Sequence, residues 1–205
     1  MPLITRALFE TEGLEVRKGQ DGKQSLIGYA VRWDKLSVPI YGSFRERVRA
    51  GAFTESLKSN NVRALWNHNS DFVLGSTGGK TMTLREDDKG LYFEIDLPDT
   101  QIGRDAAITI QRGDVTGMSF GFNTRKQEWD ETDPKNVIRT LIDVDLREIS
   151  PTPFPAYQQT KVGVRSVDDD FMEIMGERKR EAEKRQAEDF DANNTARLRN
   201  LKFVI

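Results

Sequence analysis

The chain has 205 residues, of which 37% are hydrophobic and 31% are charged, and its formal net charge is −2. That length allows one sizeable core with an appendage, and the near-neutral charge gives no basic field of the kind that binds nucleic acid. Because the chain has no cysteine and a single histidine, disulfides and thiolate nucleophiles are excluded, and a zinc site would have to be almost all carboxylate. We therefore expect neither a metal nor a cofactor.

Membrane and export signals are also missing from the sequence. It has no apolar run of about 18 residues, which a spanning helix needs, and no charged segment followed by a short apolar one at its start. We expect no membrane span and no signal peptide, and hence a cytoplasmic location.

The composition changes near residue 167. Residues 168–205 contain no proline, one glycine, 10 acidic and 8 basic residues. Helix-forming residues and mixed charges at helical spacing predict a charged, helix-prone tail there. The predicted organisation is a flexible N-terminal segment 1–12, a folded body 13–167 and the tail 168–205.

Within the body, most of the predicted elements are strands. Residues 25–33 carry β-forming residues around Gly28, and residues 81–98 form two alternating runs around a turn at 87–90, as a hairpin does. Residues 136–150 alternate between apolar and polar over a long stretch, with Ile142, Val144 and Leu146 on one face.

Two segments instead show helical spacing. In residues 43–59, Phe44, Val48 and Ala52 fall along one side, and Ser43 can act as an N-cap. Residues 100–114 begin with a threonine cap and end at Gly113, where helices often end. Together the elements predict a mainly β fold with peripheral helices (α+β), in the form of a barrel or compact sheet.

Residues 114–122, DVTGMSFGF, set a single hydroxyl among glycines. If this run is a strand, Met118, Phe120 and Phe122 share a face that is buried, and Ser119 lies with Gly117 and Gly121 on the other. Ser119 is then either a small filler in a strand that needs close backbone approach, or an exposed nucleophile. The Gly-x-Ser-x-Gly spacing alone does not decide this, since the helix that follows the serine in α/β-hydrolases is not predicted here.

The only histidine lies in a second strand-like block, residues 62–77. By strand alternation, Val62, Ala64, Trp66 and His68 share one mostly apolar face. A structural histidine at a strand end would explain this pattern. A general base would explain it too, because imidazole titrates near neutral pH and can accept a proton from serine.

Glu148 continues the alternation of Ile142, Val144 and Leu146, so it is predicted to place a carboxylate on the apolar face of its strand. Such a carboxylate must be paired or hydrogen-bonded. A salt bridge to an arginine across the sheet, exposure at the strand end, or orientation of His68 would each satisfy it. Asp143 and Asp145 point the other way and are weaker candidates.

Prolines at positions 151, 153 and 155 follow this strand. They remove every second backbone donor and leave Thr152, Phe154 and Ala156 as donors in a stiff turn. Thr152 and Phe154 are therefore candidates for an oxyanion hole, although such connections also occur for structural reasons alone.

Several blocks of the sequence together resemble the prohead (capsid maturation) protease family of tailed bacteriophages. The blocks are GYAVRWDKLS, FRERVRAGAFTESL, VRALWNHNSDFVLGST, GLYFEIDLPDT, GDVTGMSFGF and REISPTPFPAY, in order over about residues 14–165. The resemblance implies the fold of the herpesvirus maturation protease (assemblin), a β-barrel ringed by helices, with a serine–histidine centre in the chain order histidine, serine, third member.

Transferred to this chain, the resemblance implies Ser119 as nucleophile and His68 as general base and acid. The herpesvirus enzymes use a second histidine as third member, which this chain lacks. Either Glu148 replaces it and orients His68, or the site is a dyad. Gly117 and Gly121 are then expected to give a substrate backbone clearance to approach Ser119.

The implied function is a serine endopeptidase that cleaves the scaffolding segment of the major capsid protein, and itself, inside the assembling procapsid in the host cytoplasm. Its expected partners are the capsid protein and further copies of itself, as a dimer or higher oligomer, with no nucleic acid and no membrane. The alternative is an inactive relative that acts as a scaffold or capsid-interaction protein. A serine esterase is disfavoured by the missing helix after the serine.

Overall fold

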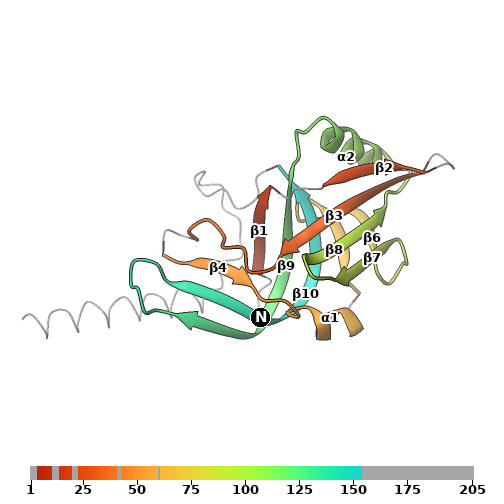
Figure 1. Ribbon diagram of the computed structural model, residues 1–205. Coiled ribbons are helices and arrows are strands. Elements are labelled where there is room, and N and C mark those ends of the chain that lie inside the picture. The colour runs from red at the N-terminus through yellow and green to blue at the C-terminus, as the bar shows by residue number, and fades with distance from the viewer. Residues whose placement is uncertain (1–3, 11–13, 20–22, 41–42, 60, 154–205) are drawn as a thin grey trace, which may run out of the picture. The chain divides into compact units, whose positions relative to one another are not determined.

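The computed structural model describes residues 4–10, 14–19, 23–40, 43–59 and 61–153 (Figure 1). Ten strands and two helices lie in these ranges: β1 (Ile4–Glu10), β2 (Glu15–Lys18), β3 (Gln24–Arg32), β4 (Arg45–Val48), α1 (Thr54–Ser59), β5 (Arg63–Trp66), β6 (Asn69–Ser76), β7 (Met82–Glu86), β8 (Gly90–Asp96), α2 (Gln101–Gln111), β9 (Gly117–Asp130) and β10 (Ile138–Thr152). The prediction of a mainly β fold with few helices is confirmed.

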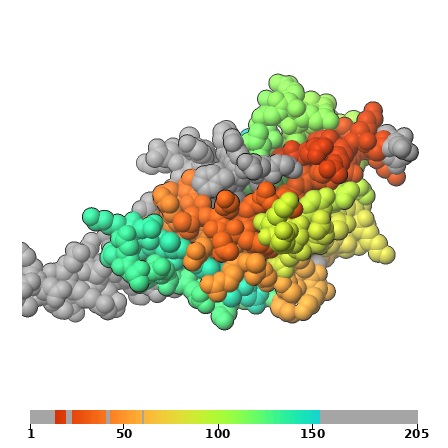
Figure 2. All heavy atoms as spheres, in the orientation of Figure 1, coloured from red at the N-terminus to blue at the C-terminus, as the bar shows by residue number. Residues whose placement is uncertain are grey.

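The strands form two sheets. In the larger sheet the order is β1-β9-β10-β5-β6, with β4 also beside β10, and in the smaller one it is β2-β3-β8-β7. Figure 2 shows the red-to-orange segment that contains β3 packed directly against the yellow-green segment that contains β7 and β8. A closed barrel is not seen among the described strands, so that finer expectation stays a prediction.

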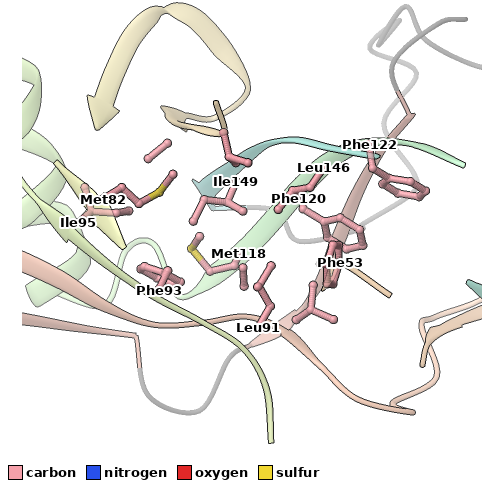
Figure 3. Packing of buried hydrophobic residues seen from close by; sticks show 14 of the residues in the cluster. Phe53, Met82, Leu91, Phe93, Ile95, Met118, Phe120, Phe122, Leu146 and Ile149 are labelled. Carbon is pink, nitrogen blue, oxygen red and sulfur yellow. The ribbon is translucent and has the colours of Figure 1, made fainter. Parts of the chain in front are cut away.

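Both sheets contribute to one hydrophobic core (Figure 3). Met118, Phe120 and Phe122 are fully buried, which confirms the predicted apolar face of the 114–122 run. The Phe120 ring lies 5.0 Å from that of Phe122 and 5.8 Å from that of Phe53, measured between ring centroids. Burial of each such ring stabilises the fold by about 1.5–3 kcal/mol, so this core holds β9 firmly in place.

The predicted hairpin and the second predicted helix are both present. Strands β7 and β8 pair antiparallel around the turn that follows Glu86. The hydroxyl of Thr100 accepts a hydrogen bond from the Gly103 N–H at 3.3 Å and so caps α2, and Gly113 follows the helix with φ +79. Local capping chemistry is enough to define this helix.

The predicted helix over 43–59 is mostly wrong. Its first half contains β4, in which Glu46 and Val48 are buried, with Phe44 buried just before the strand. Only residues 54–59 are helical, as α1. β4 pairs in parallel with the start of β10. Apolar residues four apart fit a helix and a strand equally well, and here pairing with a distant strand decides.

The N-terminal segment also differs from its prediction. Residues 4–10, expected to be flexible, form β1 and pair antiparallel with β9. The described residues all belong to one compact unit, and the predicted tail at 168–205 lies outside the described residues. No helix in the described ranges is long and apolar enough to cross a membrane.

The turn between β7 and β8 is held by Asp87. Its Oδ1 atom accepts hydrogen bonds from the backbone N–H groups of Lys89 at 2.9 Å and Gly90 at 3.1 Å, and its Oδ2 atom accepts one from the Tyr29 hydroxyl at 3.0 Å. Burial raises the pKa of Asp87, but these hydrogen bonds outweigh it and hold the pKa below its usual value.

We expect Asp87→Ala to lower the free energy of unfolding at pH 7 by about 1–2 kcal/mol, because two part-buried hydrogen bonds and one exposed one lose their acceptor. Since the folded-state pKa is lowered, the carboxylate stabilises the fold above the usual aspartate pKa of about 4, and this stabilisation is lost as the pH falls through the folded value. Urea titrations from pH 7 to acid should show the difference between wild type and variant shrinking. The neighbouring, exposed Asp88→Ala is the matched control and should change little.

Candidate active site

His68 lies in a hairpin turn and not in a strand. Trp66 of β5 pairs with Asn69 of β6, which leaves a two-residue loop made of Asn67 and His68. Both loop residues have positive φ, 50 and 61, as a type I′ turn requires. The predicted strand position of His68 is therefore wrong: the strand ends at Trp66, and the turn brings the imidazole to the end of the hairpin.

Glu148 faces the opposite way from the prediction. In the pairing of β10 with β9, Leu146 lies opposite Phe122 and Glu148 opposite Gly121, so Arg147 is an extra residue, a β-bulge. A bulge reverses the alternation of side chains. Glu148 consequently leaves the apolar face of Leu146 and joins the face that carries Gly121.

The bulge brings His68 and Glu148 into contact. The His68 Nδ1 atom lies 2.7 Å from Glu148 Oε1, with the glutamate side chain 5% exposed and the histidine side chain 28% exposed. Since a carboxylate accepts hydrogen bonds, Nδ1 is the donor of this contact, and in the neutral imidazole Nε2 is then the nitrogen that can accept a proton. Of the alternatives for Glu148, the contact fits the orientation of His68, since the side chain is not exposed and no arginine of the described ranges pairs with it.

Ser119 lies on the same face. It is directly opposite Ser150 in the β9–β10 pairing, and Gly121 is opposite Glu148, so these four residues share one side of the sheet. The Ser119 side chain is fully buried, and its Oγ atom has no hydrogen-bond partner among the residues that the structure describes. The hydroxyl is thus close to the Glu148–Ser150 segment but is not exposed as predicted, and it makes no hydrogen bond to His68 in this structure.

Gly121 has a different neighbour from the one expected. A Cβ atom added there would lie 2.5 Å from Glu148 Oε1, which is far inside contact distance. The missing side chain of Gly121 therefore makes space for the carboxylate that holds His68. For Gly117, which pairs with Thr152, clearance for a substrate backbone stays a prediction.

The predicted oxyanion-hole residues are only partly within the described structure. Thr152 is the last residue of β10, and its hydroxyl donates a hydrogen bond to Asn67 Oδ1 at 3.0 Å. It therefore belongs to a strand and not to the stiff turn that was expected. Phe154 lies outside the described residues, and the oxyanion hole stays a prediction.

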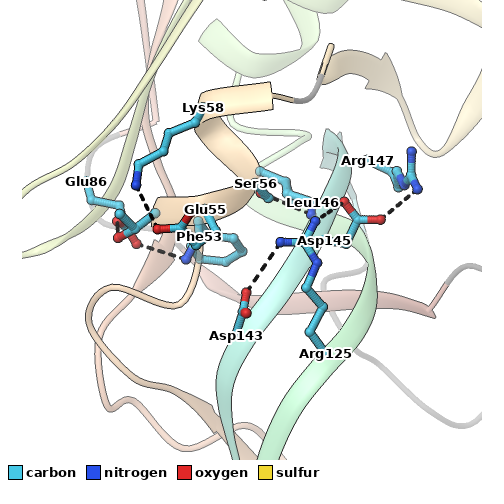
Figure 4. Close-up of polar contacts among 11 residues, drawn as sticks. Phe53, Glu55, Ser56, Lys58, Glu86, Arg125, Asp143, Asp145, Leu146 and Arg147 are labelled. Carbon is cyan, nitrogen blue, oxygen red and sulfur yellow. Dashed lines mark hydrogen bonds and ion pairs between the residues drawn. The ribbon is translucent and has the colours of Figure 1, made fainter.

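Asp145 is beside the site on the same face but is engaged by arginines (Figure 4). One Asp145 oxygen lies 3.1 Å from Arg125 and the other 2.6 Å from Arg147, while Asp143 lies 3.7 Å from Arg125. Among the described carboxylates, Glu148 is therefore the one in contact with His68. Among the described residues, no cluster of three or more histidine, cysteine or acidic side chains could hold a metal ion.

Ser150 is the residue that sequence reasoning missed. Its hydroxyl donates to Glu148 Oε2 at 2.6 Å and accepts a hydrogen bond from the His68 backbone N–H at 3.2 Å. A signal for it was present, since residues two apart in a strand share a face, and Ser150 follows Glu148 by two.

We expect Gly121→Ala to lower the free energy of unfolding by about 1–3 kcal/mol, because the new methyl group must displace a buried carboxylate. In a Glu148→Ala background the same substitution should cost little, since its obstacle is gone. Urea titration of the four proteins of this double-mutant cycle measures the coupling. Equal costs in both backgrounds would mean that Gly121 is not there to accommodate Glu148.

Comparisons with known proteins give the family of this chain. The family model described as caudovirus prohead serine protease matches residues 12–173. The chain is 31% identical over 173 residues to the prohead protease of Enterobacteria phage HK97, covering 82% of this chain and 72% of that protein. Among solved structures, the bacteriophage T4 capsid assembly protease matches with a TM-score of 0.49 at 10% identity, covering 74% of this chain and 98% of that one. The family match and the curated relative together show that this chain belongs to the caudovirus prohead serine proteases.

Proposed function

We propose that this chain is a serine endopeptidase of capsid maturation, with Ser119 as nucleophile, His68 as general base and acid, and Glu148 as the residue that orients His68. The observation that carries the proposal is the 2.7 Å contact between His68 Nδ1 and Glu148 Oε1. It is made by the only histidine of the chain, on the sheet face that also carries Ser119.

The proposed reaction begins when Nε2 of His68 accepts the Ser119 proton as Oγ attacks a peptide carbonyl carbon. Glu148 stabilises the imidazolium that forms, and backbone N–H groups stabilise the tetrahedral oxyanion. His68 then protonates the leaving amine, and water hydrolyses the acyl-enzyme. Because Ser119 is fully buried, peptide binding must first expose its Oγ atom and bring it within hydrogen-bond reach of Nε2.

The substrates follow from family membership and from the name of the HK97 relative, a prohead protease. We propose that they are the scaffolding segment of the major capsid protein and the protease itself, cleaved inside the assembling procapsid within the host cell. A dimer or higher oligomer, and closure of the sheets into a herpesvirus-protease-like barrel, are parts of the same proposal.

A second candidate function is that of an inactive relative that binds capsid protein as a scaffold. The burial of Ser119 favours it, as does the lack, within the described ranges, of a hydrogen-bond partner for its Oγ atom. The two functions differ in whether Ser119 is needed for cleavage of any protein.

We expect Ser119→Ala and His68→Ala each to abolish cleavage when the chain is co-expressed with its phage's capsid protein. Mass spectrometry of the capsid protein and of the protease identifies the fragments. If wild type and Ser119→Ala give identical fragments, the chain is not a serine protease and the scaffold function stands.

We expect Glu148→Gln to lower kcat by about 10²–10⁴-fold, because the amide removes the charge that stabilises the imidazolium. The fold should survive, since a glutamine can accept from Nδ1 with its oxygen while its amide donates to Ser150. The measurement is cleavage of a peptide that spans a mapped cleavage site. An unchanged kcat would mean that the site works as a dyad.

A further inference from the structure

We propose that Ser150 is a positioning residue of this active site, whose single hydroxyl holds both the Glu148 carboxylate and the His68 backbone. The proposal rests on the proposed function, because it takes His68 and Glu148 as the base and its orienting residue. What it adds is a fourth residue and a physical reason why the imidazole has one orientation.

The Ser150 hydroxyl uses both its donor and its acceptor capacity in this site. A serine hydroxyl has one proton to donate and two lone pairs to accept with. In Ser150 the proton goes to Glu148 Oε2 at 2.6 Å, and the oxygen accepts the His68 N–H at 3.2 Å. Because Oε1 of the same carboxylate contacts His68 Nδ1, Ser150, Glu148 and His68 form a closed ring of contacts.

The Glu148 carboxylate depends on the hydrogen bond from Ser150 because it is buried. Glu148 is 4% exposed and Ser150 is fully buried, so solvent is scarcely available to replace a lost partner. A buried carboxylate oxygen that loses its hydrogen bond keeps the cost of its desolvation without compensation. Because Ser150 already donates to Oε2, the carboxylate gains nothing by rotating, and Oε1 stays against the imidazole.

Ser150 also supports the backbone of His68, by accepting a hydrogen bond from its N–H. Its φ of 61 lies in the left-handed region, which is unfavourable for residues other than glycine. Central residues of a two-residue hairpin have no partner strand of their own, so their N–H groups need other acceptors. Here the Asn67 N–H bonds to the Pro151 carbonyl at 3.1 Å and the His68 N–H to Ser150 Oγ. β10 thus anchors the turn at adjacent residues.

Ser56 provides a matched control (Figure 4). It is also fully buried, and its Oγ atom accepts the Leu146 N–H of β10 at 3.2 Å, the same distance as in the His68–Ser150 bond. Unlike Ser150, it does not contact the Glu148 carboxylate. Substitution of either serine removes a buried hydroxyl that satisfies a backbone N–H, so a purely structural effect should be similar in both.

The test uses the imidazole itself as a probe, because the chain has one histidine. The ¹⁵N resonances of His68 in the purified full chain report which ring nitrogen carries the proton. In wild type and Ser56→Ala we expect the Nδ1–H tautomer, and in Ser150→Ala a mixture with the Nε2–H tautomer. We expect Ser150→Ala to lower kcat for a peptide spanning a mapped cleavage site about 10–100-fold with little change in KM, and Ser56→Ala to leave both near wild type.

A second variant guards against loss of folding. Ser150→Cys is nearly the same shape, and its thiol is a weak donor, so its tautomer signal and kcat should lie between those of wild type and Ser150→Ala. Wild-type tautomer signals in the Ser150 variants, or a kcat no lower than that of Ser56→Ala, would overturn the proposal. Failure of the proposed function is a separate result, since it is read from Ser119→Ala, while the tautomer measurement requires no cleavage.

Discussion

The pairing of β9 with β10 is the constraint on which the rest of the site depends. It runs from Asp130 opposite Ile138 to Gly117 opposite Thr152, and its register sets Ser119 against Ser150 and Gly121 against Glu148. The buried aromatic residues of β9 fix that strand in the core on one face. The opposite face can therefore carry polar groups. Because β9 is fixed in the core, the positions of these polar groups are fixed as well.

Polar groups on that face are arranged so that each satisfies another. The Glu148 carboxylate is out of reach of bulk water, and its two oxygens are taken by His68 and Ser150. The space for it exists because Gly121 opposite has no side chain. A buried carboxylate that is hydrogen-bonded through both oxygens has few ways to move, and the imidazole it holds is correspondingly restrained. Among the described residues, Ser119 is the exception, since its hydroxyl is buried without a hydrogen-bond partner.

The arrangement also explains why the histidine lies in a turn. The two residues of such a hairpin turn have a defined backbone conformation, but no residue of a neighbouring strand pairs with them within the hairpin. β10 supplies the missing partners through Ser150, Pro151 and Thr152, which contact Asn67 or His68. The turn is therefore positioned by the same strand that carries Glu148, and both groups move together if that strand moves.

The sequence by itself determined the elements whose signals are local. The 81–98 hairpin, the cap and end of α2, and the apolar face of Met118, Phe120 and Phe122 follow from turn residues, capping hydroxyls and alternation. It also singled out Ser119, His68 and Glu148, because a lone hydroxyl among glycines, a single histidine and a misplaced carboxylate are unusual in any context.

Only the tertiary structure decided how those residues are presented. The bulge at Arg147 turned Glu148 to the other face of the sheet. The pairing of Trp66 with Asn69 placed His68 in a hairpin turn. Pairing with β10 made residues 45–48 a strand. Each of these depends on which strand lies alongside, and alternation read along one segment contains no information about its neighbour. The buried state of Ser119 has the same origin, since the solvent exposure of a side chain is set by contacts between segments far apart in the chain.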